Sequence, residues 1–252
     1  MTDFITVEHQ DKVCIVTLSR PEAKNAINQD MYGAMADALL DADERDDVRA
    51  VLLRAEGDIF TAGNDLRDFQ SSRDGGEPPV GRFLRAIREV NVPFLIAVNG
   101  AAIDIGLTML LHADLIIADE TASFKAPFAQ IGVVPEAGSS ILLPQAVGIA
   151  WANDILLTGR SVTAEEALSI GLISRVYPKA ELQAEALKLA KQVAAMAPNA
   201  MKESKRLIRA SRDVIAKQME KEFRQRRQDL ESSHAVTVKA LEAGRKRYSE
   251  QF

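Results

Sequence analysis

The sequence predicts an α/β fold, because short apolar segments with strand character alternate with segments of helical spacing. Three apolar segments of strand length occur at Ala50–Arg54, Phe94–Val98 and Asp114–Ala118. Loops and helix-like stretches separate them, and this alternation is typical of a sheet covered by helices. From about Ala180 onward the pattern is wholly helical and rich in charge. A helical C-terminal quarter appended to an α/β core suggests an oligomerisation element.

The N-terminal elements have clear local signals. The segments Phe4–Glu8 and Lys12–Leu18 flank the polar triplet His9–Asp11, which predicts a β-hairpin. The next segment, Asn28–Arg45, has apolar residues at helical spacing. We expect Asn28 to cap this helix, because its side chain can accept a hydrogen bond from the first turn.

The composition of two further segments predicts that they are exposed to solvent. The stretch Ser71–Pro79 combines glycine, proline and charge, so we expect an exposed loop there. The segment Glu220–Glu231 carries many charges, which is typical of a solvated helix face. No proline- or glycine-rich linker separates the α/β part from the helical part.

The bulk composition limits the classes of function. The chain has 252 residues and a net charge of -5, which gives no general reason to expect nucleic acid as a partner. A phosphorylated ligand is still compatible with this charge, because backbone N–H groups can hold it. The single cysteine, Cys14, excludes an intrachain disulfide and a cysteine metal cluster. Since the sequence shows neither a secretory signal nor an uncharged apolar stretch of membrane length, we expect a cytoplasmic protein without membrane contact.

Two segments offer backbone N–H groups to a ligand. The first, Phe60–Leu66, contains small residues that let a ligand approach the main chain, although a simple turn is the plainer interpretation. The second, Val98–Thr108, leads from a strand through small residues into a helix expected at Ile105–His112. The first N–H groups of a helix have no internal partner and carry partial positive charge. Such groups can stabilise an oxyanion.

A third segment, Pro127–Ser140, contains one carboxylate among apolar and small residues, Glu136. In dry surroundings its pKa rises, which suits a group that moves protons. The plainer interpretation is a carboxylate in the first turn of a helix that follows it. The three histidines show no metal-ligand spacing, and the sequence lacks a nucleophile elbow, a P-loop and a dinucleotide fingerprint.

Taken together, these segments resemble the enoyl-CoA hydratase/isomerase superfamily, the crotonases, in order over most of the chain. The resemblance is carried by four segments and the sequence around them: RPEAKNAI at Arg20–Ile27, AGNDL at Ala62–Leu66, VNGAAIDIG at Val98–Gly106, and LTGR at Leu157–Arg160. It implies a spiral core of ββα units in residues 1–195 and a C-terminal helical trimerisation region in residues 196–252. It also implies an acyl-CoA thioester as partner and a homotrimer or dimer of trimers.

The resemblance is closest in pattern to the Δ3,Δ2-enoyl-CoA isomerases of the peroxisomal type. The positions of the two hydratase glutamates are occupied by Thr108 and Phe128, which leaves Glu136 as the matching acid/base. The implied reaction moves a 3-enoyl-CoA double bond to give 2-trans-enoyl-CoA, in fatty-acid degradation. It needs no metal and no cofactor, since CoA is part of the substrate.

The resemblance also implies a set of site residues. The thioester oxygen is expected between the N–H groups of Asn64 and Ile105, with Glu136 as the base. The residues expected to bind substrate are Lys24, Ala26, Ala62, Gly63, Asn64, Asp65, Leu66, Asp104 and Phe128. Lys24 is expected to meet the CoA phosphates, although a solvated lysine explains it equally well.

The chain departs from the family at Asp104, where a glycine is expected beside the oxyanion hole. Aspartate is a good N-cap for a helix that starts at Ile105, and it tolerates unusual backbone angles. It also places a charge near the developing enolate. Two like charges about 4 Å apart repel by roughly 4 kcal/mol at an effective dielectric near 20, so isomerase activity could fall about a thousandfold. A protonated carboxyl, or one turned away, avoids this penalty.

Two alternatives to the isomerase therefore stay open. One is another crotonase reaction of the hydratase or dehydratase type, in which Asp104 works with Glu136. The other is an acyl-CoA-binding relative that has lost turnover.

Overall fold

The computed structural model describes residues 2–65 and 77–232, and its centre is a six-stranded sheet. The strand order is β1-β2-β3-β4-β6-β9. Strands β1 and β2 are antiparallel, and every later neighbour in this sheet is parallel. The bounds are β1 Ile5–Gln10, β2 Val13–Leu18, β3 Ala50–Ala55, β4 Phe94–Val98, β6 Leu115–Asp119 and β9 Arg175–Tyr177.

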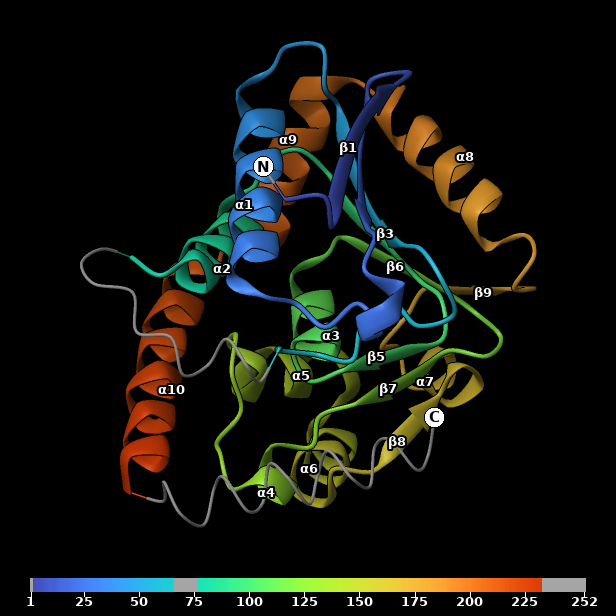
Figure 1. Ribbon diagram of the computed structural model, residues 1–252. Helices are drawn as coiled ribbons and strands as arrows, with labels where there is room; N and C mark the ends of the chain where they lie inside the picture. The colour runs from blue at the N-terminus through green and yellow to red at the C-terminus, as the bar shows by residue number, and fades with distance from the viewer. Residues whose placement is uncertain (1, 66–76, 233–252) are drawn as a thin grey trace.

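Helices cover both faces of this sheet (Figure 1). Helices α1 (Gln29–Glu44) and α2 (Pro79–Glu89) pack on one face, and α8 (Leu182–Ala194) packs on the other. Alternate residues of β3 therefore enter two different cores, with Val51 and Leu53 toward α1 and Leu52 toward α8. A sheet buried on both faces explains why β4 is apolar throughout and why β2 and β3 are apolar over their first four residues.

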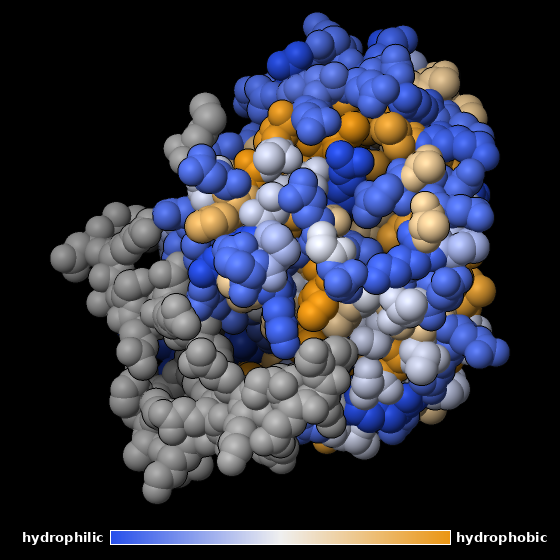
Figure 2. All heavy atoms as spheres, turned by 45° about the vertical axis from the view of Figure 1, so that its right-hand side comes forward, coloured by the Kyte–Doolittle hydropathy of each residue, from blue (hydrophilic) through white to orange (hydrophobic). Residues whose placement is uncertain are grey.

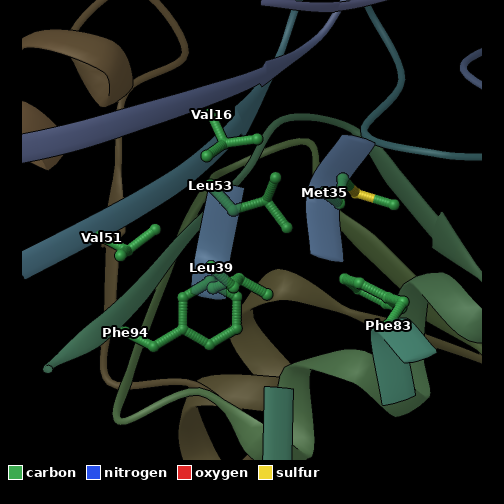
Figure 3. A pocket seen from close by; sticks show the side chains of 7 residues that line it. All are labelled: Val16, Met35, Leu39, Val51, Leu53, Phe83 and Phe94. Carbon is green, nitrogen blue, oxygen red and sulfur yellow. The ribbon is translucent and has the colours of Figure 1, made fainter. Parts of the chain in front are cut away.

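Part of the core lies between the sheet and helices α1 and α2. Figure 3 shows seven apolar side chains around a small cavity there: Val16, Met35, Leu39, Val51, Leu53, Phe83 and Phe94. They come from three strands and both helices. Because the lining is apolar, the cavity belongs to the packed interior and offers no polar group to orient a ligand.

A second, three-stranded sheet lies below the first in Figure 1 and has the order β5-β7-β8. Short helices surround it and connect the two sheets. The strands are β5 Ala101–Ile103, β7 Ser123–Lys125 and β8 Ser161–Thr163. The helices are η1 Pro21–Ala23, α3 Ile105–Thr108, η3 Met109–His112, α4 Phe128–Ile131, α5 Ser139–Val147, α6 Ile149–Thr158 and α7 Ala164–Ser169.

Two helices complete the described chain, α9 (Pro198–Ile208) and α10 (Arg212–Ser232). Helix α9 is tied to the main sheet by Lys205, whose buried ammonium donates to the Val92 carbonyl at 2.7 Å and pairs with Asp114 at 2.7 Å. Helix α10 runs along the side of the molecule that carries α1 and α2 (Figure 1). The face in Figure 2 is mainly hydrophilic, with hydrophobic residues scattered among polar ones.

Several local predictions are confirmed. The N-terminal hairpin forms, Asn28 caps α1 by accepting from Met31 N at 2.9 Å, and Cys14 is fully buried in β2. The helix expected at Ile105–His112 is one α-helical turn followed by a 3-10 turn. Strand β6 begins one residue later than predicted: Asp114 N still donates to Phe94 O at 2.7 Å, but Phe94 N donates to the Asp114 carboxylate at 2.8 Å and not to a main-chain carbonyl.

The loop expected at Ser71–Pro79 lies largely outside the described residues, and Pro79 already begins α2. None of the described helices is long and apolar enough to cross a membrane.

Candidate functional site

The site begins where the segment after β2 meets the segment after β3. Three backbone hydrogen bonds join them: Ala62 N to Lys24 O at 3.0 Å, Ile27 N to Gly63 O at 2.8 Å, and Asp65 N to Ile27 O at 2.9 Å. The structure thus brings together two groups of predicted substrate-binding residues that are about forty positions apart: Lys24 and Ala26 with Ala62, Gly63, Asn64 and Asp65. Leu66 lies outside the described residues.

One arginine reinforces this junction from the side. The Arg20 guanidinium donates to the Ala26 carbonyl at 2.9 Å and to the Asp65 carboxylate at 2.7 Å. Both side chains of this ion pair are less than one fifth exposed. The geometry gives Asp65 a structural contact within the site, and it fixes the backbone that presents Asn64.

Asn64 faces the turn that precedes α3. Its backbone N–H donates to Asp104 Oδ2 at 3.2 Å, and its side-chain Nδ2 donates to the same oxygen at 2.6 Å. Tyr32, buried in α1, donates its hydroxyl to Asn64 Oδ1 at 2.6 Å. Because Tyr32 takes the amide oxygen, the amide nitrogen is turned toward Asp104.

Asp104 has a backbone conformation that favours glycine, with φ 59° and ψ -119°. It fits only because its neighbour across the turn has no side chain. A Cβ on Gly63 would lie 2.7 Å from the Asp104 Cβ, closer than real contacts allow. Any side chain at position 104 in this conformation therefore requires a glycine at position 63.

The capping role predicted for Asp104 is wrong. Its side chain makes no capping hydrogen bond to α3. Only its main-chain carbonyl continues the turn, accepting from Leu107 N at 3.1 Å and Thr108 N at 3.2 Å. The carboxylate accepts instead from Asn64 N and Nδ2.

Ile105 is the first residue of α3, where helix geometry provides no partner for the N–H group. Its N–H group follows directly after Asp104. The two N–H groups expected to form an oxyanion hole, those of Asn64 and Ile105, therefore both adjoin the Asp104 turn.

Glu136 lies on the other side of this cluster. Its side chain is 14% exposed, and Oε1 lies 3.5 Å from the Asn64 Nδ2. The pKa of Glu136 is raised to about 7, chiefly by burial; Arg226 opposes this rise, and the nearby Asp104 and Glu222 carboxylates add to it. Glu136 is thus a carboxyl group that changes charge near neutral pH.

The loop that carries Glu136 is fixed by two contacts. His112 Nε2 lies 2.7 Å from the Ala137 carbonyl, and burial lowers the pKa of His112 to about 4. The imidazole is therefore neutral at pH 7 and donates its Nε2 proton to that carbonyl. On the other side, the Glu222 carboxylate accepts from Gly138 N at 2.6 Å and from the Ser140 hydroxyl.

Glu222 and its helical neighbour Arg226 come from α10, and the sequence analysis missed both. Arg226 Nη2 lies 3.3 Å from Glu136 Oε2 and 3.8 Å from Asp104 Oδ1, and the residue is 8% exposed. The prediction of a solvated face for this segment is wrong at these two positions. The spacing of four puts them on one side of the helix, but the segment contains several such pairs, so nothing in the sequence singles them out.

The two positions that the resemblance assigns to hydratase glutamates are apolar in character here. Thr108 and Phe128 are both fully buried. The Thr108 hydroxyl has no hydrogen-bond partner among the described residues, and the Arg226 guanidinium lies over the Phe128 ring at 5.3 Å from its centroid. Phe128 therefore forms a wall behind Arg226.

No group of three or more His, Cys, Asp or Glu side chains within residues 2–65 and 77–232 is arranged to hold a metal ion. The charged groups that act on Glu136 most directly are the Arg226 guanidinium and the Asp104 and Glu222 carboxylates, and the three carboxyls come from three different segments. This set can hold and move a proton next to two backbone donors.

Residues 8–252 match the sequence profile of the enoyl-CoA hydratase/isomerase family. The chain belongs to this family. The crystal structure of an enoyl-CoA hydratase/isomerase from Pseudoalteromonas atlantica T6c is similar to it, with a TM-score of 0.93 and 48% identity over 97% of this chain and 98% of the other.

Two curated relatives of this family member have different activities in their names. Enoyl-CoA delta isomerase 2 from Rattus norvegicus is 37% identical over 212 residues, which cover 81% of this chain and 54% of the relative. The chain thus spans about half the length of that relative. Carnitinyl-CoA dehydratase from Salmonella arizonae is 35% identical over 222 residues, which cover 85% of this chain and 83% of the relative.

Proposed function

We propose that this chain is an enoyl-CoA isomerase that converts 3-enoyl-CoA to 2-trans-enoyl-CoA, in fatty-acid degradation. One observation carries the proposal: Glu136 is a buried carboxyl with a pKa near 7 that faces Asn64, while both hydratase glutamate positions hold side chains that cannot act as bases. A double-bond shift needs one proton shuttle, whereas water addition in the family uses a pair of carboxylates.

The mechanism follows from the placement of these groups. The thioester oxygen accepts from the N–H groups of Asn64 and Ile105, and Glu136 removes a proton from the carbon next to the carbonyl. The electron pair moves to the oxygen and forms an enolate, which the two N–H groups stabilise. Glu136 then returns the same proton two carbons further along, as the double bond moves into conjugation. No external acid, oxidant or metal enters this balance.

The acid strength of Glu136 suits both steps. A group with a pKa near the working pH gives up and takes back a proton with little penalty in either direction. Tyr32 and His112 take no proton in this scheme: one orients the Asn64 amide, and the other holds the carbonyl that follows Glu136.

The dehydratase alternative has one specific observation in its favour. Asp104 and Glu136 both contact the Asn64 amide nitrogen and the Arg226 guanidinium, so the site does contain two neighbouring carboxyls. The alternative of a binding protein without turnover rests on the occupation of the Asn64 N–H by Asp104.

The deciding experiment incubates the purified protein with 3-trans-hexenoyl-CoA and, separately, with 2-trans-hexenoyl-CoA. The proposal expects the first to yield the conjugated 2-enoyl product and the second to gain no water. Glu136→Gln keeps the shape of the side chain and removes the base, so the rate is expected to fall by roughly a hundred- to ten-thousandfold. Hydration of the second compound, or unchanged isomerisation by the variant, contradicts the proposal.

We further propose, from the family resemblance, that the chain assembles as a homotrimer or dimer of trimers through residues 196–252 and works in the cytoplasm without a bound cofactor. Sedimentation equilibrium of the full chain tests the assembly. A monomer at micromolar concentration contradicts it.

A further inference from the structure

A hydrogen-bond donor that the proposed reaction requires is already engaged within the protein. The Asn64 N–H group points at Asp104 Oδ2, which also accepts from the Asn64 side chain. A thioester oxygen in hydrogen-bond reach of the same N–H would lie in contact with this carboxylate oxygen. The N–H group has one proton to donate, so the carboxylate oxygen and the thioester oxygen compete for it, and in the enolate state their negative charges also repel each other.

Asp104 has a second possible partner on its other side. Its Oδ1 is buried and accepts no hydrogen bond from the described part of the chain, yet Arg226 Nη2 lies only 3.8 Å from it. A shift of roughly 1 Å converts this ion pair into a charge-assisted hydrogen bond of about 2.8 Å.

Arg226 is held in place to receive that carboxylate. Its Nη1 donates to the Val134 carbonyl at 3.1 Å, and its guanidinium rests on the Phe128 ring. The arginine therefore does not need to move, whereas the Asp104 side chain faces a glycine, Gly63, with no side chain of its own to block a turn about the Cα–Cβ bond.

We propose that Asp104 competes with the thioester carbonyl for the Asn64 N–H, and that an acyl-CoA binds fully only when the Asp104 carboxylate shifts onto Arg226. This inference rests on the proposed acyl-CoA ligand and names Asp104 and Arg226 as the residues that set its affinity. It applies to ligands with a thioester carbonyl and leaves the binding of CoA itself unaffected.

The size of the effect follows from the contacts that are exchanged. The carboxylate gives up two donors, the Asn64 N–H and Nδ2, and gains one on Arg226. Hydrogen bonds to charged groups correspond to roughly 10- to 100-fold in a binding constant. Removing the competitor is therefore expected to tighten acyl-CoA binding within that range.

The first test measures the binding of hexanoyl-CoA, which has the carbonyl but no double bond, by calorimetry at pH 7. Asp104→Gly suits the backbone angles at this position and is expected to lower the Kd about 10- to 100-fold. The Kd of CoA, the matched ligand without a carbonyl, is expected to stay within twofold. An unchanged Kd for hexanoyl-CoA, or an equal change for both ligands, overturns the proposal.

The second test is a double-mutant cycle with Arg226→Met, and with Arg226→Lys as the variant that keeps the charge. With Asp104 present, loss of Arg226 is expected to raise the Kd of hexanoyl-CoA about tenfold. In the Asp104→Gly background, Arg226→Met is expected to change this Kd by less than twofold, because there is no carboxylate that must shift onto Arg226. Equal effects of Arg226→Met in both backgrounds contradict the proposed shift of the Asp104 carboxylate onto Arg226. Circular dichroism confirms that each variant is folded.

These binding measurements do not depend on turnover. If the isomerase assay fails while hexanoyl-CoA binding responds as described, the proposed reaction is wrong and the competition stands. If isomerisation depends on Glu136 but the cycle shows no coupling, the reaction stands and the competition is wrong.

Discussion

The charge balance around Glu136 leads to opposite pH shifts for two substitutions. Burial is the largest cause of its raised pKa, but two neighbours act with opposite sign: Asp104 raises it and Arg226 lowers it. Asp104→Asn keeps the size and the acceptor oxygen and removes only the charge. Arg226→Met keeps the length of the side chain and removes the counter-charge.

The magnitude can be worked from the shared contacts. Asp104 Oδ2 and Glu136 Oε1 lie 2.6 Å and 3.5 Å from the same amide nitrogen, so the two oxygens are about 6 Å apart at most. Two charges at this distance repel by roughly 3 kcal/mol at an effective dielectric near 20, which equals about 2 pKa units. We therefore expect a downward shift of about 1 to 2 units in the pKa of Glu136 from Asp104→Asn.

The assay is the pH dependence of kcat/KM for 3-trans-hexenoyl-CoA, because this quantity reports ionisations of the free protein. Glu136 works in its ionised form, so activity rises with pH through its pKa, near 7 in the unaltered protein. In Asp104→Asn the rising limb is expected to move to lower pH by about 1 to 2 units. In Arg226→Met it is expected to move to higher pH by at least about one unit, because the contact at 3.3 Å is lost.

The pair of substitutions separates electrostatic effects from structural damage. Structural damage to the site lowers kcat/KM at every pH, and the pH at which kcat/KM rises stays the same. In Asp104→Asn, the rise of kcat/KM must move to lower pH if Asp104 acts as a charge beside Glu136. A rise at the same pH, or at a higher pH, refutes this reasoning.

Two further predictions concern stability. Gly63→Ala, with φ +98° and a clash of 2.7 Å against Asp104 Cβ, is expected to lower the free energy of unfolding by about 1–3 kcal/mol in urea titrations. Adding Asp104→Gly should restore part of it. His112 has a pKa of about 4 when folded against 6.5 when unfolded, so its neutral form stabilises the fold above pH 6.5, and about 3 kcal/mol is lost as the pH falls from 6.5 to 4. His112→Gln, which still donates to Ala137, should flatten that dependence in thermal unfolding; an unchanged slope refutes the assignment.

Much of the fold follows from local patterns. The Asn28 cap, the N-terminal hairpin and the apolar strands can be predicted because each depends on neighbours within a few residues. The ends of elements are less predictable, since tertiary contacts decide them. At the start of β6 the Asp114 carboxylate takes the Phe94 N–H and pairs with Lys205, and these residues lie 20 and 91 positions away in the chain.

The candidate site is predictable only in part. Asn64, Ile105 and Glu136 are recognisable because their segments resemble those of the family in order, and the structure brings Asn64 and Glu136 within 3.5 Å. Arg226 and Glu222 could not be found in this way. A helix with many charges gives no signal for which charges are buried, because burial is decided by the segment that the helix packs against.

Asp104 shows why the direction of a side chain matters more than its identity. Aspartate before a helix usually caps it, and this is one of the two interpretations of Asp104. Here the backbone lies in the glycine region, so the side chain turns back onto Asn64, and the strain of about 1–3 kcal/mol is offset by the two donors it contacts there. A substrate carbonyl would remove those same contacts. The contacts that make Asp104 tolerable in the free protein are thus the ones that an acyl-CoA must displace, and the affinity of this site for its substrate is limited by the stability of its own turn.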